Sequence, residues 1–581
     1  MIQRACRWWH NQRSLNTAGR LSVAVLALLL VTTPVCAQSS ESIPPDETEE
    51  FDPLADLKPV LVVNVGSADR VLSTIDFVLN SVDRPELYAA LLGEPLSFFE
   101  NLDWMHRDQP FGMMMFVKPA LPPQPTPVFF VPVKDVRKLV ALMSKGPLTA
   151  KKRGEAEGYY EFTGRRQSIY MSVANGYAYL SPDEELADLE HADPLEANAT
   201  LTSRYDAALS IQLDNFPPII REVFINYLRA SAESELQQRD EESEAAYRIR
   251  RAYGISTLEL LSQTLEHGER FVIGLDASAE KKSALLEMAI DARADSDFAD
   301  YLDAVGTKPT RFGSLINDFQ PLTASLSWAM DKRERTAATE LVNGLELALA
   351  GQLPTEAGEG GSINRLCSVL RETVDEGHFD FCTQFVMDET GQFVLLGALR
   401  TKPSEDLSLP LRQVLTAVSS TTDIEADIEI DAAKYERTAI HRITPSDARD
   451  DDRRLYGRAP DILCAATPGI FWFAVGGDGA QTAMEFAMDL VAEAETAPVE
   501  SRTPPFQMIF RVSPWLQLPP PPDNPPQVRE IAGEAFDDRN DSLRIEVRPT
   551  ETGLRLRAEF AEGFIRLIGT AIARRYDESQ L

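Results

Sequence analysis

Short runs of hydrophobic residues recur along most of the chain, and turns or segments with helical spacing separate them. The first run, PVLVVNV at Pro59–Val65, is typical of a buried strand. Ser67 then precedes hydrophobic residues that share one helical face as far as Leu79, which predicts a capped helix. Two strands and a second helix complete this unit, called pattern A, and are expected at Pro110–Val117, at Thr126–Val133 and after Asp135.

A second unit, called pattern B, is predicted at about Gly158–Leu189, where three strand-like runs precede a helix. The Asn-Gly pair at 175–176 favours a two-residue hairpin turn between the last two strands. Ser181 is the expected N-cap of the helix, and Pro182 suits its first position. Glu184, three residues after Ser181, would complete a capping box.

The stretch ANGYAYLSPDEELADL at Ala174–Leu189 has a counterpart in TPGIFWFAVGGDGAQTAMEFAMDL at Thr467–Leu490. Each predicts a turn, an aromatic strand, a polar cap and an amphipathic helix. The order A–B–A runs through Pro59–Val305 and again through Leu322–Tyr576, so we interpret the chain as a duplication. The evidence is the order of elements and their caps, because few residues are identical; the alternative is that any α+β chain can be divided into such units.

The hairpins and two-sided strand patterns predict an α+β fold with two similar halves, each of mainly antiparallel sheets with helices packed on one face. A cleft between the halves would be a natural ligand position. The expected organisation is a signal peptide at 1–37, a flexible acidic linker at 38–58, a first half at 59–305, a connection at 306–321, a second half at 322–576 that duplicates the first, and a tail at 577–581.

The N-terminus predicts export. Residues 1–37 contain four arginines and no acid, then the apolar run Leu21–Leu30, and then small residues that favour cleavage after Ala37. The apolar run of about 13 residues as far as Thr33 is short for a membrane span, which needs about 20. An uncleaved membrane anchor is the minor alternative. Cys36 stands in a poor context for lipidation, because Pro34 and Val35 precede it.

Charge excludes one class of partner. The chain of 581 residues has a net charge of −33, and cleavage after residue 37 would make it −37. So negative a protein repels phosphate backbones and anionic lipid headgroups. We therefore expect no nucleic-acid partner and, after signal cleavage, no stable membrane span. The length and the 44% of hydrophobic residues are those of a folded protein with more than one core.

Three cysteines would remain in the exported chain: Cys367, Cys382 and Cys464. An odd number permits at most one intramolecular disulfide. Cys367 and Cys382 are the closest pair in sequence and form the candidate disulfide. The alternative is that all three are small buried residues, which we favour for Cys464. The chain contains no CxxC motif that would indicate thiol redox chemistry.

The sequence offers no recognisable catalytic set. It contains no GxSxG and no HExxH motif. No two histidines have the spacing of metal ligands on a helix, so each is interpreted as a surface or hydrogen-bonded residue. We therefore assign no catalytic, cofactor-binding or metal-binding residue and expect no cofactor. The histidines considered are His106, His191, His267, His378 and His441.

Four loops carry weaker signals. Val475–Ala480, VGGDGA, follows a strand and opens a helix as phosphate-binding loops do, but it lacks the Lys-Ser/Thr ending. A tight turn capped by Asp478 is the preferred interpretation, and Gly358–Ser362 is a second glycine loop. Asp447–Arg454 and Asp537–Asp541 are acidic, but they lack the alternating ligands of a calcium loop and contain arginines. We expect both to be solvated loops.

The phrases PVLVVNVGSADRVLSTIDFVLN and TPVFFVPVKDVRKLVALM resemble uncharacterised exported proteins of planctomycete-like bacteria, which carry repeated strand-then-helix units after a signal peptide. The resemblance extends over Pro59–Tyr576 and rests on pattern, without an invariant motif. It implies an envelope or secreted location and no particular activity, so no functional residue is carried over.

These observations favour an exported, non-enzymatic binding or scaffold protein of the bacterial envelope, periplasmic or secreted, whose partner is an unknown envelope protein or ligand. One alternative is an exported hydrolase, which requires a carboxylate pair or a Ser/His/Asp cluster in a cleft between the halves. The other is a carrier of an apolar ligand, which requires a continuous apolar cavity.

Overall fold

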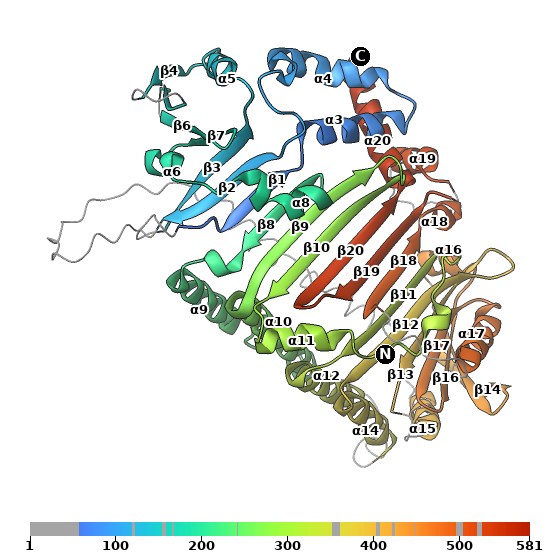
Figure 1. Ribbon diagram of the computed structural model, residues 1–581. Coiled ribbons are helices and arrows are strands. Elements are labelled where there is room, and N and C mark those ends of the chain that lie inside the picture. Colours follow the sequence, from blue (N-terminus) through green and yellow to red (C-terminus); the bar gives the residue numbers. More distant parts are fainter. Residues whose placement is uncertain are drawn as a thin grey trace, which may run out of the picture. The chain divides into compact units, whose positions relative to one another are not determined.

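Twenty strands form one hydrogen-bonded antiparallel sheet in the computed structural model (Figure 1). The described residues belong to one compact unit, Leu54–Thr421 with Glu425–Leu581. The structure describes residues 57–580, except 119–122, 154–157, 166–167, 241, 351–360, 403–406, 421–424, 448, 495–503, 520–525 and 538.

The strands fall into two series of ten along the sequence. The first series is β1 (Leu61–Val65), β2 (Phe111–Lys118), β3 (Gln124–Pro132), β4 (Thr149–Lys152), β5 (Tyr160–Thr163), β6 (Ser168–Ala174), β7 (Tyr177–Ser181), β8 (Ala207–Gln212), β9 (Gly268–Ser278) and β10 (Ser283–Ala292). The second is β11 (Leu322–Ala329), β12 (His378–Met387), β13 (Phe393–Arg400), β14 (Ala426–Tyr435), β15 (Thr438–Pro445), β16 (Asp461–Thr467), β17 (Ile470–Gly476), β18 (Phe506–Arg511), β19 (Ser542–Pro549) and β20 (Gly553–Ala561).

Strand pairing follows the same order in both series. The first runs β4-β5-β6-β7-β3-β2-β1-β8-β9-β10. The second runs β14-β15-β16-β17-β13-β12-β11-β18-β19-β20. Antiparallel pairing of β10 with β20 joins the two series into one sheet, and Figure 1 shows these strands next to each other.

The helices connect and cover the strands. In the first series they are α3 (Ala68–Asn80), α4 (Glu86–Phe98), α5 (Val136–Met143), α6 (Glu184–Asp188), α7 (Pro194–Ala197), α8 (Ala199–Arg204), α9 (Pro218–Glu235), α10 (Glu244–His267) and α11 (Asp297–Val305). In the second they are α12 (Lys332–Ala350), α14 (Ser362–Asp375), α15 (Ser408–Ser419), α16 (Asp450–Tyr456), α17 (Ala480–Ala494), α18 (Ser513–Gln517), α19 (Pro526–Ala535) and α20 (Glu562–Gln580). Short 3-10 turns lie at Glu100–Leu102, Leu213–Asn215 and Gly313–Leu315.

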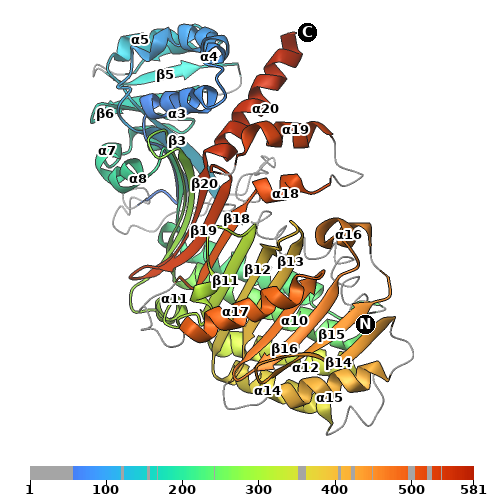
Figure 2. The same cartoon turned by 90° about the vertical axis from the view of Figure 1, so that its right-hand side faces the viewer.

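Helices cover both faces of the sheet, so the expectation of helices on one face is wrong. Leu463 and Ala465 of β16 belong to the core under α17. Cys464 and its neighbours at 462 and 466 pack instead in the core with Leu411 of α15. Side chains alternate across a strand, so β16 lies between the two helices (Figure 2). The same alternation explains the consecutive aromatic residues 471–473, of which Trp472 faces α17.

The last helix of each series packs against the other series. α11 follows β10, but its core includes Trp328 of β11 and Leu554 of β20. α20 follows β20 and packs through Ala573 against Leu79 of α3. α20 also continues to Gln580, through the residues expected to form a tail. The two series therefore share core residues on both sides of the β10–β20 pair.

Several local predictions are confirmed. Ser67 caps α3, because its hydroxyl accepts from the Arg70 amide, and Asp135 caps α5. The sequence at 331–334 also predicts a reciprocal capping box, which Asp331 and Glu334 form with hydrogen bonds of 3.0 and 2.8 Å. These caps were predictable because each depends on residues only three positions apart.

Two local predictions are wrong. Asp183, not Ser181, caps α6, and its carboxylate accepts from the Leu186 amide. Ser181 instead accepts from the Asp183 amide and donates to the Pro127 carbonyl, so it fixes the turn before the helix. The sequence also predicts a helix that Pro410 interrupts, but Pro410 lies in the first turn of α15, where the missing amide costs nothing, and the helix is continuous.

Candidate functional site

Two buried histidines make contacts within the fold. His191 Nε2 donates to the Leu186 carbonyl at 2.9 Å and stacks on Tyr179, and burial lowers the pKa of His191. His441 is 2% exposed, its Nδ1 accepts from the Asp431 amide, and burial lowers its pKa. Among the residues that the structure describes, no group of three histidine, cysteine or acidic side chains could hold a metal ion.

The nearest approach to a hydrolase cluster is Ser327, His378 and Asp380. Ser327 Oγ lies 2.9 Å from His378 Nε2, and burial lowers the pKa of His378 to about 4. Asp380 is fully buried, which raises its pKa to about 6. Sequence reasoning missed this group, because Ser327 is 51 residues from His378 and nothing in their local sequence suggests a contact.

The geometry of this cluster is structural. Ser327 is fully buried and donates its proton to the Lys308 carbonyl, so it is neither accessible to a substrate nor poised to give that proton to His378. Both Asp380 oxygens are held by Thr310 Oγ1 and the Arg311 amide, at 2.8 Å each, and neither bonds the imidazole. The cluster therefore fastens the connection 306–321 to β11 and β12. A nucleophile needs a free lone pair facing a substrate, which Ser327 lacks.

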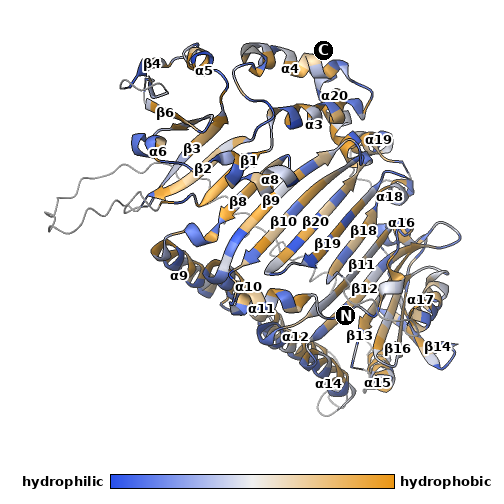
Figure 3. Ribbon diagram, viewed as in Figure 1, coloured by the Kyte–Doolittle hydropathy of each residue, from blue (hydrophilic) through white to orange (hydrophobic). Residues whose placement is uncertain are grey.

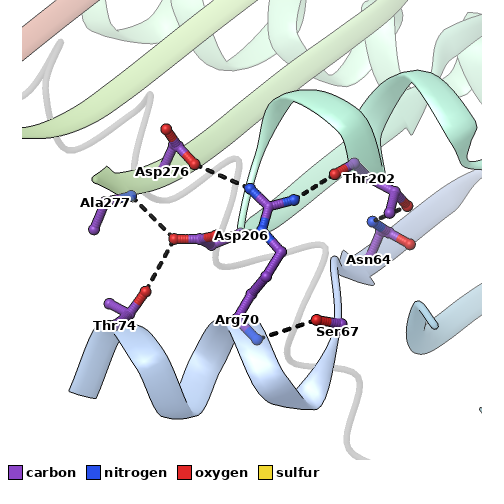
Figure 4. A network of polar contacts seen from close by, with 8 residues as sticks. All are labelled: Asn64, Ser67, Arg70, Thr74, Thr202, Asp206, Asp276 and Ala277. Carbon is purple, nitrogen blue, oxygen red and sulfur yellow. Dashed lines mark hydrogen bonds and ion pairs between the residues drawn. The ribbon is translucent and has the colours of Figure 1, made fainter. Parts of the chain in front are cut away.

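A second polar network surrounds Arg70 on α3 (Figure 4). Its guanidinium pairs with Asp206 at 2.7 Å and with Asp276 at 3.1 Å, and it also donates to the Thr202 carbonyl. Asp206 additionally accepts from the Thr74 hydroxyl and the Ala277 amide, so all of its partners belong to the fold. Burial and the nearby Asp206 raise the pKa of Asp276. The network ties α3 to strands β8 and β9 and leaves no free group for catalysis.

A cavity of about 790 Å³ lies beside α17 and is the best candidate site of the described residues. This volume lies within the roughly 300–1,000 Å³ that is usual for ligand pockets. Its lining combines apolar side chains with amide, hydroxyl and acidic side chains. The apolar residues include Leu315, Val386, Leu396, Ala483, Phe486 and Leu490, and the amides are Asn317, Gln320, Gln384 and Gln392.

Glycines position the mouth of this cavity. A Cβ at Gly479 would lie 2.7 Å from the Asp388 Cβ, closer than two carbon atoms can pack. A Cβ at Gly477 would lie 3.1 Å from the Tyr456 carbonyl oxygen. Asp388 holds its own turn by accepting from the amides of Thr390 and Gln392. The glycines of VGGDGA thus let α17 begin close to the β12–β13 turn.

Asp478, the expected cap of α17, is 97% exposed and pairs with Arg458 at 2.9 Å. Arg458 also pairs with Asp461 at 3.0 Å, so the cationic group at the cavity already has two anionic partners. The lining contains neither histidine nor cysteine nor serine. Such a cavity can bind an apolar group and hydrogen-bond to a polar end. The Thr390 hydroxyl in its lining donates to Asp388 at 2.7 Å within the β12–β13 turn, and the lining contains no histidine to act as a base.

The carboxylates of the acidic loops pair with arginine side chains of the same chain. Residues 450–456 form α16, whose arginines 453 and 454 pair with acids three positions earlier. Asp541 is 1% exposed, pairs with Arg511 and accepts from the Ser513 amide. Asp537 pairs with Arg566, which lowers its pKa. The glycine loop at 358–362 lies mostly outside the described residues. The predicted signal peptide lies wholly outside them, as does most of the predicted acidic linker.

The three cysteines are buried free thiols. Burial raises the pKa of Cys367 to about 11 and those of Cys382 and Cys464 to about 12, so they form thiolates poorly. Cys382 belongs to the core under α17, whereas Cys367 lies on α14 and is not part of that core. The packing gives no support to a Cys367–Cys382 disulfide, which stays a prediction.

No helix in the described part of the chain combines the length and the apolar composition that crossing a membrane requires. No protein-family model, curated protein or solved structure matches the chain. The candidate site therefore rests on its own geometry.

Proposed function

We propose that the protein is an exported, non-enzymatic binding protein of the bacterial envelope, and that its ligand site is the cavity beside α17. One observation carries this proposal: the cavity has the volume of a ligand pocket, and its lining combines apolar side chains with amides but contains no histidine, cysteine or serine. Export is supported by the N-terminal sequence pattern alone.

The ligand that suits this site has an apolar part and a hydrogen-bonding end. Leu396 and Ala483 offer contact with hydrocarbon, and Phe486 at the rim is 63% exposed. Gln392 and Asn317 at the mouth can both donate and accept hydrogen bonds. The carrier alternative is contained in this proposal, because a ligand with a long acyl chain would use the same apolar wall.

The serine-based form of the hydrolase alternative has little support among the described residues. Its requirement is an accessible Ser/His/Asp cluster or a carboxylate pair with perturbed pKa values in a cleft. The one cluster of the first kind contains the fully buried Ser327, which is hydrogen-bonded to the Lys308 carbonyl.

We also propose that the two strand series are copies of one ancestral segment. The support is the identical pairing order of ten strands and the reciprocal packing of α11 and α20. Superposition of residues 59–305 on 322–576 tests this idea: equivalent strands should coincide throughout, and a superposition limited to a few strands would contradict it.

A binding titration tests the ligand site. N-phenyl-1-naphthylamine, an apolar probe that fluoresces when it leaves water, should bind the purified mature protein saturably at one site. Ala483→Trp fills the cavity and should weaken probe binding by about tenfold or more. The reason is that the probe loses apolar contact that contributes about 1.4 kcal/mol or more to its binding. Ala492→Trp places the same ring on an exposed position of α17 and should bind as wild type does. Equal binding by all three proteins would refute the proposed site.

A further inference from the structure

A cluster of arginines lies where the two strand series meet. Glu287 on β10 stands directly opposite Arg557 on β20, and its side chain is only 5% exposed. Arg555 Nε lies 3.1 Å from one carboxylate oxygen and Arg557 Nε 3.5 Å from the other. Arg204, at the end of α8, lies 3.8 Å away. One buried carboxylate thus faces three guanidiniums.

The neighbouring strand adds more positive charge. Arg548 on β19 stands directly opposite Arg555 on β20, an arrangement of like charges that normally destabilises a sheet. The acid that Arg548 contacts is Glu546, at 2.9 Å. Four guanidiniums therefore contact two carboxylates, which is an excess of two positive charges among the contacting groups. Glu559, on the same face of β20, is exposed and stands opposite Arg544. This excess is unexpected in a chain whose net charge is −33.

The guanidinium groups remain reachable and incompletely bonded. The side chains of Arg204 and Arg557 are each 43% exposed, Arg555 is 28% exposed and Arg548 is 60% exposed. The Nε atoms of Arg555 and Arg557 are buried without a hydrogen-bond partner, because their approach to Glu287 lacks hydrogen-bond geometry.

The helices that cover β20 lie on its other face. α11 packs on Leu554, and Phe564 of α20 packs on Phe560. Residues alternate along the strand, so Arg555 and Arg557 project away from both helices. Figure 3 shows this mixture of polar and apolar positions along β10, β20 and β19. The charged face at the β10–β20 pair is thus left open by the helices that contact β20.

We infer that this arginine cluster, Arg204, Arg548, Arg555 and Arg557 around Glu287, binds an oxyanion group, phosphate or carboxylate, of a multivalent anionic ligand. Planar guanidiniums match both groups by paired hydrogen bonds, and an anion would balance the excess charge. Both strand series supply residues, so the site exists only in the joined sheet. It is separate from the cavity beside α17 and does not depend on the proposed function.

The test uses the mature protein and two probes, pyrophosphate for phosphates and citrate for carboxylates, in isothermal titration at constant ionic strength set by sodium chloride. At least one probe should bind saturably to wild type, and the tighter one identifies the ligand class. Arg555→Gln should weaken binding about tenfold or more, because it removes a charged hydrogen-bond donor. Arg544→Gln is the matched control. It removes an arginine of β19 that Asp318 already holds at 2.8 Å, and it should leave binding unchanged.

Glu287→Gln separates binding from a merely structural role. It removes the internal anion while keeping the side-chain shape, so the probe should bind about three- to tenfold more tightly although the protein itself becomes less stable. A structural salt bridge alone predicts the loss of stability without tighter binding. The inference is overturned if neither probe binds wild type beyond the effect of sodium chloride, if Arg555→Gln and Arg544→Gln bind equally, or if Glu287→Gln binds no better.

Discussion

The hairpin β6–β7 with its helix α6 and the hairpin β16–β17 with its helix α17 share a sequence pattern but differ in how the helix begins. After β7, the side chains of Ser181 and Asp183 hold the turn, and α6 ends after five residues. After β17, glycines at 477 and 479 bring the chain against the β12–β13 turn, and α17 continues for 15 residues. The two helices thus begin differently and differ in length.

The two regions also differ in what lies beneath the helix. Near α6, His191 stacks on Tyr179 with ring centroids 4.5 Å apart and bonds the Leu186 carbonyl of the helix. Beside α17, the sheet and the helix leave the cavity of about 790 Å³. The longer helix thus borders a cavity, whereas the shorter helix on the same kind of hairpin contacts a buried imidazole.

The largest expected effect is at Trp472, which is 1% exposed in the core under α17. Trp472→Ala should lower the free energy of unfolding by about 3–5 kcal/mol, because it leaves a large void and removes the hydrogen bond to Thr467. Urea unfolding followed by circular dichroism measures it. A loss below about 1 kcal/mol would show that α17 does not close a tightly packed core.

The next effect is at Gly479. Gly479→Ala places a methyl group 2.7 Å from the Asp388 Cβ and should cost about 1–3 kcal/mol through overpacking. Gly176→Ala in the β6–β7 turn is the comparison. Nothing lies within 4 Å of its added Cβ, so its cost comes only from the positive φ of 77°. If Gly479→Ala is neutral in urea unfolding, the glycine is not required for close approach.

The third prediction concerns pH and the buried groups under the connection. Burial raises the pKa of Asp380 from 3.8 to about 6, so its contribution to stability falls as pH rises from about 4 to 6. Burial lowers the pKa of His378 from 6.5 to about 4, so its contribution is lost as pH falls over nearly the same range. The two dependences oppose each other in the wild type.

Asp380→Asn should remove the pH dependence of stability that comes from Asp380 and leave the one that comes from His378. The stability of the variant relative to wild type should then rise between pH 4 and 6 by about 1–3 kcal/mol. Urea unfolding at a series of pH values measures this difference. A difference that is constant with pH, or that falls as pH rises, would show that Asp380 is not held with a raised pKa.

The smallest effects on stability are expected at Asp183 and Asp478, the acidic residues before α6 and α17. Asp183→Ala removes the cap of α6 and the ion pair with Lys118, and it should cost about 1 kcal/mol. Asp478→Ala removes only an exposed pairing with Arg458 and should cost less than about 0.5 kcal/mol. Thermal unfolding of both variants measures the contrast. Equal losses of stability in the two variants would indicate that Asp478 caps α17.

Local features of the fold could be predicted from sequence, and features that join distant segments could not. Ser67, Asp135 and the Asp331–Glu334 pair act within one helical turn, so their roles follow from spacing. Ser181 was assigned wrongly because Asp183, two residues later, competes for the same role. The pairing of all strands into one sheet was not predicted, since it depends on the contact of β10 with β20, about 270 residues apart.

The candidate sites were missed for the same reason. The cavity beside α17 combines side chains from the connection, the β12–β13 turn, α16 and α17, and only the glycines of VGGDGA hinted at it. The cluster around Glu287 joins α8, β10 and β20, and no local motif marks it. The buried Ser327–His378 contact shows how a site could be assigned wrongly, because residue types associated with catalysis can meet for structural reasons.

The most direct test of the account is native mass spectrometry of the mature protein purified gently from its own envelope fraction, together with Ala483→Trp and Ala492→Trp. The account predicts that wild type and Ala492→Trp carry a bound small molecule of the same mass, and that Ala483→Trp, which fills the cavity, does not. A ligand that Ala483→Trp retains, or wild-type protein that carries no ligand and takes up none from an envelope extract, would contradict it.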